Sequence, residues 1–214
     1  MKEAKSKMSG ELAKAVADLK EQEVLKLTKG MLDRGEDPNK ILVESRSGME
    51  VVGKRFSDGE YFLPELIYSA EIFKEIAEIV KPKLTKGVQA KRIGKCIIGT
   101  VAGDIHDIGK DIVVFMLDVS GFEVYDLGVD VPAQKFVDKI KETKAPIVGL
   151  SGFLTLAFDS MKETVDAIKK AGLRDKVKIM IGGGQIDEEI RKYSGADAYG
   201  RDAMTAVTLA KKWL

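Results

Sequence analysis

The chain has 214 residues, of which 44% are hydrophobic and 32% charged, which is typical of a folded, water-soluble protein. With 35 Lys and Arg against 34 Asp and Glu, the formal net charge is +1, which argues against nucleic-acid or membrane-surface binding driven by bulk charge. The single cysteine, Cys96, excludes an internal disulfide and a multi-cysteine metal cluster, and fits a reducing compartment. No apolar run approaches the roughly 20 residues of a membrane span. We therefore expect a cytoplasmic protein with neither nucleic acid nor membrane as partner.

The first 80 residues show only helical periodicity, in four amphipathic segments with short connections. Asp37 and Pro38 are typical of a helix start, because aspartate caps free N–H groups and proline fits the first turn. The last of the four helices opens at Pro64. Its buried stripe is predicted to comprise Leu66, Ala70, Phe73, Ala77 and Val80. Four such helices indicate an antiparallel bundle.

After a basic stretch marked by proline and glycine at 81–92, strand patterns alternate with helix patterns. This stretch is interpreted as a solvated linker, the alternative being a docking patch of lysines. Strands are predicted at 93–101, 122–127, 147–151, 177–181 and 196–199, and helices at 108–119, 132–142, 160–171, 187–193 and 202–213. Five apolar strands with crossover helices predict an α/β, Rossmann-like unit with a doubly wound, five-stranded parallel sheet. We expect two domains, a helical one at 1–86 and an α/β one at 87–214.

Ligands of such sheets bind beyond the carboxyl ends of the strands, so the residues that follow each strand are the candidates for a site. His106, the chain's only histidine, follows the first strand and lies two residues after Asp104. Asp104 could accept a hydrogen bond from one ring nitrogen and leave the other nitrogen free to bind a metal. A single protein ligand suits a metal that is already held in a macrocycle. The alternative is a histidine with a purely structural role.

Glycines and small hydroxyl side chains follow the other strands. Glycine permits close approach of a ligand to the backbone, although tight strand–helix turns would also explain it. Ser151 and Thr155 could contact a ligand at the same edge or cap the next helix.

Three segments together resemble the cobalamin-binding domains. Asp104-Ile105-His106-Asp107-Ile108-Gly109 matches their DxHxxG signature. Ser151-Gly152-Phe153 and Gly182-Gly183 match the accompanying S-x-L and GG signatures in order and spacing, with phenylalanine at the third position of the former. The segments 47–53 and 59–66 resemble the helical cap that precedes this domain. The resemblance covers nearly the whole chain and points to the corrinoid proteins of methyltransferase systems, similar to the cobalamin-binding region of methionine synthase.

This resemblance implies an N-terminal four-helix bundle cap and a C-terminal flavodoxin-like domain. It implies a cobalamin bound base-off/His-on, with His106 as the lower cobalt ligand and Asp104 as its hydrogen-bond partner. Further residues implied to contact the cofactor, by resemblance or position, are Gly103, Ile105, Asp107, Ile108, Gly109, Ser151, Leu154, Thr155, Gly182, Gly183, Gly184, Tyr199, Gly200, Asp202 and Ala203. Met49 is the candidate for the upper face of the corrinoid, and the alternative for Met49 is a place in the bundle core.

The sequence also departs from the methionine synthase pattern. A serine that extends the His–Asp pair there is Ala157 here, so the pair either stops at Asp104 or finds another partner, with Thr100 or a water as candidates.

The implied function is that of a methyl carrier, not catalytic alone. It would accept a methyl group on cob(I)alamin from a donor methyltransferase, of the O-demethylase or methylamine type. It would pass the group as methyl-cob(III)alamin to an acceptor methyltransferase that uses tetrahydrofolate or a thiol. A reductive activating protein is a further expected partner. The alternatives are a cobalamin-dependent sensor or regulatory domain, and a metal-free flavodoxin-like binding module.

Overall fold

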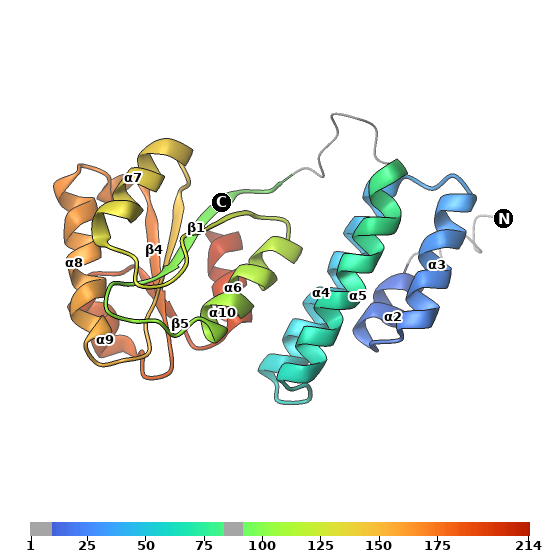
Figure 1. Cartoon of the computed structure of the whole chain (residues 1–214), viewed down its shortest axis with the longest axis horizontal. Helices are drawn as coiled ribbons and strands as arrows, with labels where there is room; N and C mark the ends of the chain where they lie inside the picture. Colours follow the sequence, from blue (N-terminus) through green and yellow to red (C-terminus); the bar gives the residue numbers. More distant parts are fainter. Residues whose placement is uncertain (1–9, 84–91) are drawn as a thin grey trace. The chain divides into compact units, whose positions relative to one another are not determined.

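The computed structural model describes residues 10–83 and 92–214, which form two compact units divided between Lys91 and Arg92 (Figure 1). The expected domain boundary, between residues 86 and 87, and most of the expected linker lie outside the described residues. We refer to residues 10–83 as the helical unit and to residues 92–214 as the α/β unit. No helix in these two ranges is both long and apolar enough to cross a membrane.

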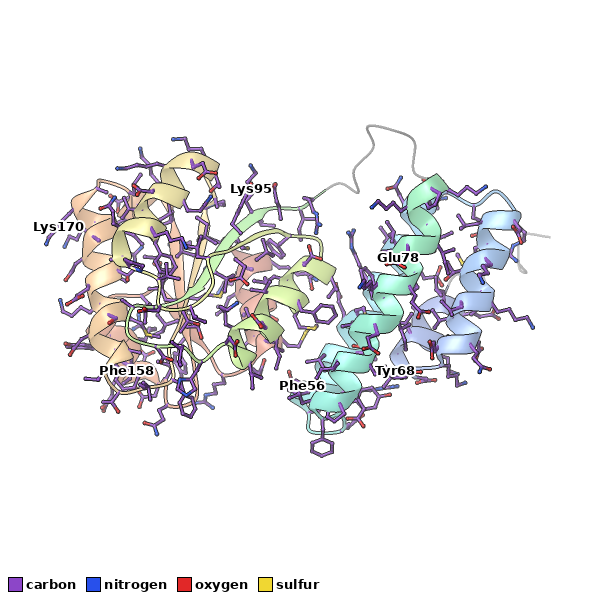
Figure 2. All side chains as sticks on the ribbon, in the orientation of Figure 1. Phe56, Tyr68, Glu78, Lys95, Phe158 and Lys170 are labelled. Carbon is purple, nitrogen blue, oxygen red and sulfur yellow. The ribbon has the colours of Figure 1, made fainter. Side chains whose placement is uncertain are left out.

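The helical unit contains the four predicted helices and a short 3-10 turn. They are α2 (Glu11–Ala17), α3 (Glu21–Asp33), α4 (Pro38–Ser57), α5 (Leu63–Val80) and η1 (Lys81–Lys83). The predicted start of α4 is confirmed, because the Asp37 side chain accepts from the backbone N–H of Asn39 at 2.9 Å. At the surface the Tyr68 hydroxyl, on the side chain labelled in Figure 2, donates to Glu21 at 2.7 Å and ties α5 to α3.

The predicted buried stripe of α5 is wrong in its middle. Leu66 and Val80 are buried as expected, but Ala70, Phe73 and Ala77 are only half-buried. The residues buried between them are Ser69, Ile72 and Ile76. This helix carries apolar residues around most of its circumference, and the face that packs on α3 and α4 is the one with the branched isoleucines.

A glycine sets the distance between α2 and α4. A Cβ atom added at Gly48 would lie 2.6 Å from the carbonyl oxygen of Ala13 and 2.7 Å from Cβ of Val16. Both distances are well inside van der Waals contact, so any larger residue must push the two helices apart. Gly48 therefore packs directly beneath α2.

We expect Gly48→Ala to lower the free energy of unfolding of the helical unit by about 2 kcal/mol, because the backbone of α2 cannot move aside cheaply. Gly30→Ala on α3 is the matched control, since among the described residues its Cβ would meet only the flexible end of Arg34. That control should be neutral or gain about 0.5 kcal/mol from helix propensity. Urea titration of the full chain, followed by circular dichroism, measures both. Equal stabilities for the two variants would contradict this account of the α2–α4 contact.

The α/β unit has a five-stranded parallel sheet of order β2-β1-β3-β4-β5, which confirms the predicted fold. Its strands are β1 (Lys95–Thr100), β2 (Glu123–Asp126), β3 (Ile147–Ser151), β4 (Lys178–Gly182) and β5 (Ala198–Gly200). Its helices are α6 (Ile108–Val119), α7 (Ala133–Thr143), α8 (Ala157–Lys170), α9 (Glu188–Ser194) and α10 (Ala203–Lys212), with a 3-10 turn η2 (Arg174–Lys176). This strand order is the flavodoxin-like one, whose topological switch point lies between β1 and β3.

Helices cover both faces of the sheet, with α6 and α10 on one side and α7, α8 and α9 on the other (Figure 1). One buried cluster includes Ile97 of β1, Val148 of β3 and Phe136 of α7, and Phe158, labelled in Figure 2, packs against it from α8. Because both faces are covered, the strands are apolar between their end residues, most completely in β1, β3 and β4. The carboxyl edge of the sheet is left for the loops that follow the strands.

Candidate corrinoid site

The site forms at the switch point, where β1 and β3 run side by side. Thr100, at the end of β1, pairs with Ser151, at the end of β3. The chain leaves β1 toward α6 and leaves β3 toward α8, so the segments 101–107 and 152–156 emerge together at one edge. Sequence reasoning placed its main candidates, Asp104 and His106, in the first of these segments.

The Asp104 carboxylate joins the two segments. Its Oδ1 accepts from the backbone N–H of His106 at 2.9 Å and lies 2.7 Å from Nδ1 of the same residue. Its Oδ2 accepts from the backbone N–H groups of Phe153, at 2.6 Å, and Leu154, at 2.9 Å. Asp104 is fully buried, so these partners replace its lost hydration. The expected His–Asp hydrogen bond is present.

This environment keeps Asp104 ionised. Burial raises the pKa of the carboxyl group, but the backbone N–H groups of His106, Leu154 and Phe153, with the imidazole, outweigh it and lower the pKa to about 2. An anionic acceptor favours a proton on Nδ1 of His106. The neutral imidazole then has its lone pair on Nε2, the form in which histidine binds a metal.

The third partner of the His–Asp pair is the protein backbone. Ala157 offers no hydroxyl, and the Thr100 hydroxyl donates instead to the carbonyl oxygen of His106 at 3.1 Å. The interpretation of Thr100 as a relay partner of Asp104 is therefore wrong. Its bond fixes the loop around His106, and Phe153 and Leu154 complete the coordination of Asp104.

The imidazole is accessible and is surrounded by apolar loops. The His106 side chain is 49% exposed although its Asp104 partner is fully buried. Large apolar side chains that are exposed on the segments following β1, β2 and β3 are Ile105, Ile108, Val129, Phe153, Leu154 and Leu156. Exposed apolar side chains gathered near one edge in this way mark a binding surface, and their chemistry suits an apolar ligand face. Because His106 is the chain's only histidine, it can supply one imidazole to a metal that already has other ligands.

Glycine occurs at three positions of this edge, and a different reason explains it at each. Gly183 has φ +148°, and a Cβ there would lie 1.8 Å from the carbonyl oxygen of Gly152, so the fold itself requires glycine. A Cβ on Gly184 would lie 2.6 Å from the Phe153 ring. A Cβ on Gly109, inside α6, would meet no atom of the described residues within 4 Å beyond its own helical turn, and the backbone is not left-handed, so the described fold does not require glycine there. Close approach of a ligand would explain it.

The other predicted site residues also lie at or near the strand ends. Ser151 and Gly182 end β3 and β4, and Thr155 is exposed in the turn before α8. Tyr199 and Gly200 belong to β5. The remaining ones are Gly103, in a left-handed turn held by Asp130, the exposed Asp107, Asp202, which caps α10, and the buried Ala203.

Met49 belongs to the helical unit. It lies on α4 and is fully buried, the placement expected of a core residue. Its contact with a cofactor stays a prediction.

Sequence reasoning missed two residues at this edge. In the sequence Phe153 is only a departure from the S-x-L signature, whereas in the structure its ring contacts His106. Lys110, directly after the DxHxxG signature, has a side chain only 2% exposed, and its ammonium group binds Asp126 at 2.7 Å. The opposite charge of Asp126 compensates burial of this lysine and ties α6 to the end of β2. Its position beside the signature was the available signal.

The domain is doubly wound, and its accessible imidazole is held by a buried carboxylate and surrounded by exposed apolar side chains. This combination is expected of a corrinoid-binding class of protein. Residues 94–208 match the family described as B12 binding domain, and residues 9–81 match a second family of the same description. The dimethylamine corrinoid protein of Methanosarcina barkeri is 38% identical over 214 residues, 99% of both chains. The trimethylamine corrinoid protein of the same organism is 37% identical over 97% of this chain and 96% of its own length.

Two solved structures agree with these relatives. A cobalamin-binding protein from Desulfitobacterium hafniense superimposes with a TM-score of 0.81 and 41% identity, covering 95% of this chain and 97% of that one. A chain of the methanol:cobalamin methyltransferase complex MtaBC from Methanosarcina barkeri gives a TM-score of 0.82 at 28% identity, and the match covers 96% of this chain and 79% of that one. The chain belongs to the B12-binding corrinoid proteins of methyltransferase systems. This confirms the resemblance noted in the sequence and favours a cofactor-binding protein over a metal-free module.

Proposed function

We propose that the protein is a methyl carrier that binds its corrinoid base-off/His-on, with His106 as the lower cobalt ligand. The observation that carries this proposal is the accessible imidazole whose Nδ1 is held by the buried Asp104 carboxylate. When bound, the corrinoid supplies a cobalt centre that takes a methyl group from one partner and gives it to another. The protein supplies position, a low-water environment and a fixed proton at Nδ1 of His106.

The remaining residues at the carboxyl edge would hold the rest of the cofactor. Ile105, Ile108 and Leu154 would cover the corrin face beside His106 and exclude water from it. The small residues Ser151, Thr155, Gly182 and Gly183 would line the slot for the displaced nucleotide tail, with 199–203 at its far wall. The helical unit, proposed as a cap domain at 1–86 preceding the cofactor domain at 87–214, would cover the other face of the corrinoid.

The relatives support a methylamine-type donor. Several are named dimethylamine or trimethylamine corrinoid proteins and align over more than nine-tenths of this chain. We therefore propose a methylamine:corrinoid methyltransferase as the first partner, in preference to an O-demethylase. The second partner would be an acceptor methyltransferase that uses a thiol or tetrahydrofolate, and a reductive activating protein would return oxidised cobalt to its reactive state. Methyl transfer from mono-, di- and trimethylamine, each with its own donor methyltransferase, tests this assignment. Transfer only from methanol or methoxylated aromatics would contradict it.

We expect His106→Ala to retain the corrinoid but to lose protein ligation of cobalt. Retention is expected because the exposed apolar side chains and the residues proposed to line the tail slot do not depend on His106. Ligation should be lost because the chain has no second histidine. Equilibrium dialysis with hydroxocobalamin measures retention, and the absorption spectrum of the bound cofactor reports the axial ligand. An unchanged spectrum in the variant would contradict the ligand assignment.

A further inference from the structure

Phe153 contacts the imidazole that the proposed function uses. The ring centroids of Phe153 and His106 are 4.7 Å apart, with an angle of 37° between the ring planes. This separation lies within the range of favourable contacts between aromatic rings. Phe153 is 48% exposed, so its ring is not buried for the sake of the core, and its position beside His106 calls for another reason.

Asp104 alone does not fix the orientation of the imidazole. Its Oδ1 holds Nδ1 of His106 at one point, and the plane of the ring can still tilt through coupled changes of the two side-chain torsions. A neighbour on the face of the ring restricts this tilt and so helps to set the direction of Nε2. Phe153 is placed for that purpose, because its backbone N–H also donates to Oδ2 of Asp104. One residue thus holds the carboxylate through its backbone and the imidazole through its side chain.

Gly184 makes room for this arrangement. A Cβ atom there would lie 2.6 Å from Cε2 and 3.0 Å from Cδ2 of Phe153. Its backbone is outside the left-handed region, so alanine is permitted by the backbone and the atoms that must move are those of the Phe153 ring. Gly184 therefore supports the position of His106 through Phe153.

We propose that Phe153 is a positioning residue for His106, and that Gly184 admits its ring. The consequence for cobalt ligation rests on the proposed function, whereas the contact itself exists without cofactor. Truncation of Phe153 should leave the Asp104 network intact, because that network uses only the backbone of Phe153 and Leu154. The imidazole should then sample several orientations, and a smaller fraction of the cobalt should be bound by histidine.

The first test uses the protein without cofactor. The single histidine yields one set of imidazole signals in a ¹H–¹⁵N spectrum, so each change is assigned without ambiguity. Phe153→Ala should remove the ring-current shift of the imidazole protons, and Phe153→Tyr should retain it. Imidazole signals that are unchanged in Phe153→Ala would overturn the proposal.

A double-mutant cycle separates this route from a general disturbance of the loop. Gly184→Ala should shift the imidazole signals in the native chain, because it displaces the phenyl ring. In the Phe153→Ala background the same substitution should have no effect, because the ring it displaces is gone. Equal shifts in both backgrounds would show that Gly184 acts on His106 by another path, and would overturn the proposed role of Gly184.

The second test uses the cobalamin-loaded protein in its cob(II) state, in which electron paramagnetic resonance shows nitrogen splitting when histidine is bound. Phe153→Ala should reduce the histidine-bound fraction severalfold, and Phe153→Tyr should restore it. Native-like splitting in the alanine variant would overturn the positioning role. Absence of histidine splitting in the native protein would instead contradict the proposed function and leave the cofactor-free result standing.

Discussion

Replacing Asp104 with asparagine should invert the tautomer of His106 and remove its capacity to bind cobalt. The asparagine oxygen can still accept from Phe153 and Leu154, which turns its NH₂ group toward His106. That group donates to Nδ1, so the ring proton moves to Nε2 and the lone pair needed for a metal is lost. The NH₂ group also faces the partly buried backbone N–H of His106, which loses its acceptor. We expect a loss of about 3 kcal/mol in the free energy of unfolding.

The ¹⁵N shifts of the single imidazole measure the tautomer directly, and chemical denaturation measures the stability. Asp130→Asn is the matched control. Asp130 also accepts a backbone N–H, from Gly103 at 2.7 Å, but it is exposed and asparagine can supply the same oxygen. The control should therefore be nearly neutral. Unchanged ¹⁵N shifts in Asp104→Asn would contradict the role assigned to the carboxylate.

The Asp104 carboxylate should also make the free energy of unfolding depend on pH in the acid range. Its pKa falls from an ordinary 3.8 to about 2 on folding, so the stability it contributes is complete above about pH 4 and is lost as the pH falls toward 2. The difference in unfolding free energy between the native chain and Asp104→Asn should narrow over this interval. A constant difference would indicate that the variant acts through some other contact.

Gly183→Ala should destabilise the α/β unit more than the addition of a single methyl group at any other position. The residue has φ +148°, and the added Cβ would overlap the carbonyl oxygen of Gly152, a backbone atom between β3 and α8. The backbones are already close there, because the N–H of Gly152 donates to the carbonyl of Gly182 at 3.1 Å. We expect a loss of about 4 kcal/mol or more, a large part of the stability of an ordinary domain. Soluble yield and the urea midpoint measure it, and a native midpoint would contradict the geometry.

Gly109→Ala is its informative counterpart. Within residues 10–83 and 92–214, no atom outside its own helical turn lies within 4 Å of the added methyl group. Alanine favours the helix by about 0.8 kcal/mol over glycine, so the cofactor-free protein should be as stable as the native chain or more so. Corrinoid affinity should nevertheless fall, because the methyl group would occupy space next to the ligand. Unchanged affinity would mean that no ligand approaches Gly109 closely.

Much of the α/β unit could be predicted from the sequence, because apolar periodicity is strong there. The helix at 108–119 and the strand at 147–151 have the predicted bounds. The helix that follows β3 begins at Ala157, three residues earlier than predicted, because the backbone N–H groups of Ala157 and Phe158 bond to the carbonyls of Leu154 and Thr155. On α5 the stripe was misassigned, because a helix that is apolar around most of its circumference does not reveal which face packs inward.

The His–Asp pair was visible in the sequence as two side chains two residues apart. The groups that complete it were not visible, because backbone N–H groups are present at every residue and only the fold brings those of Phe153 and Leu154 to Asp104. The contact between Phe153 and His106 joins residues 47 positions apart and depends on the pairing of β1 with β3. A sequence signature can locate such a site, but the groups that hold its side chains in place are brought together only by the tertiary structure.

The central claim is that His106 is the cobalt ligand, and nitrogen isotope substitution tests it most directly. The protein is produced with ¹⁵N-histidine, loaded with cobalamin and reduced to cob(II), and its electron paramagnetic resonance spectrum is compared with that of the unlabelled protein. Because the chain has one histidine, the account predicts that the threefold splitting from ¹⁴N becomes the twofold splitting of ¹⁵N. A threefold splitting that persists after labelling would assign the ligand to the cofactor's own base and contradict the account.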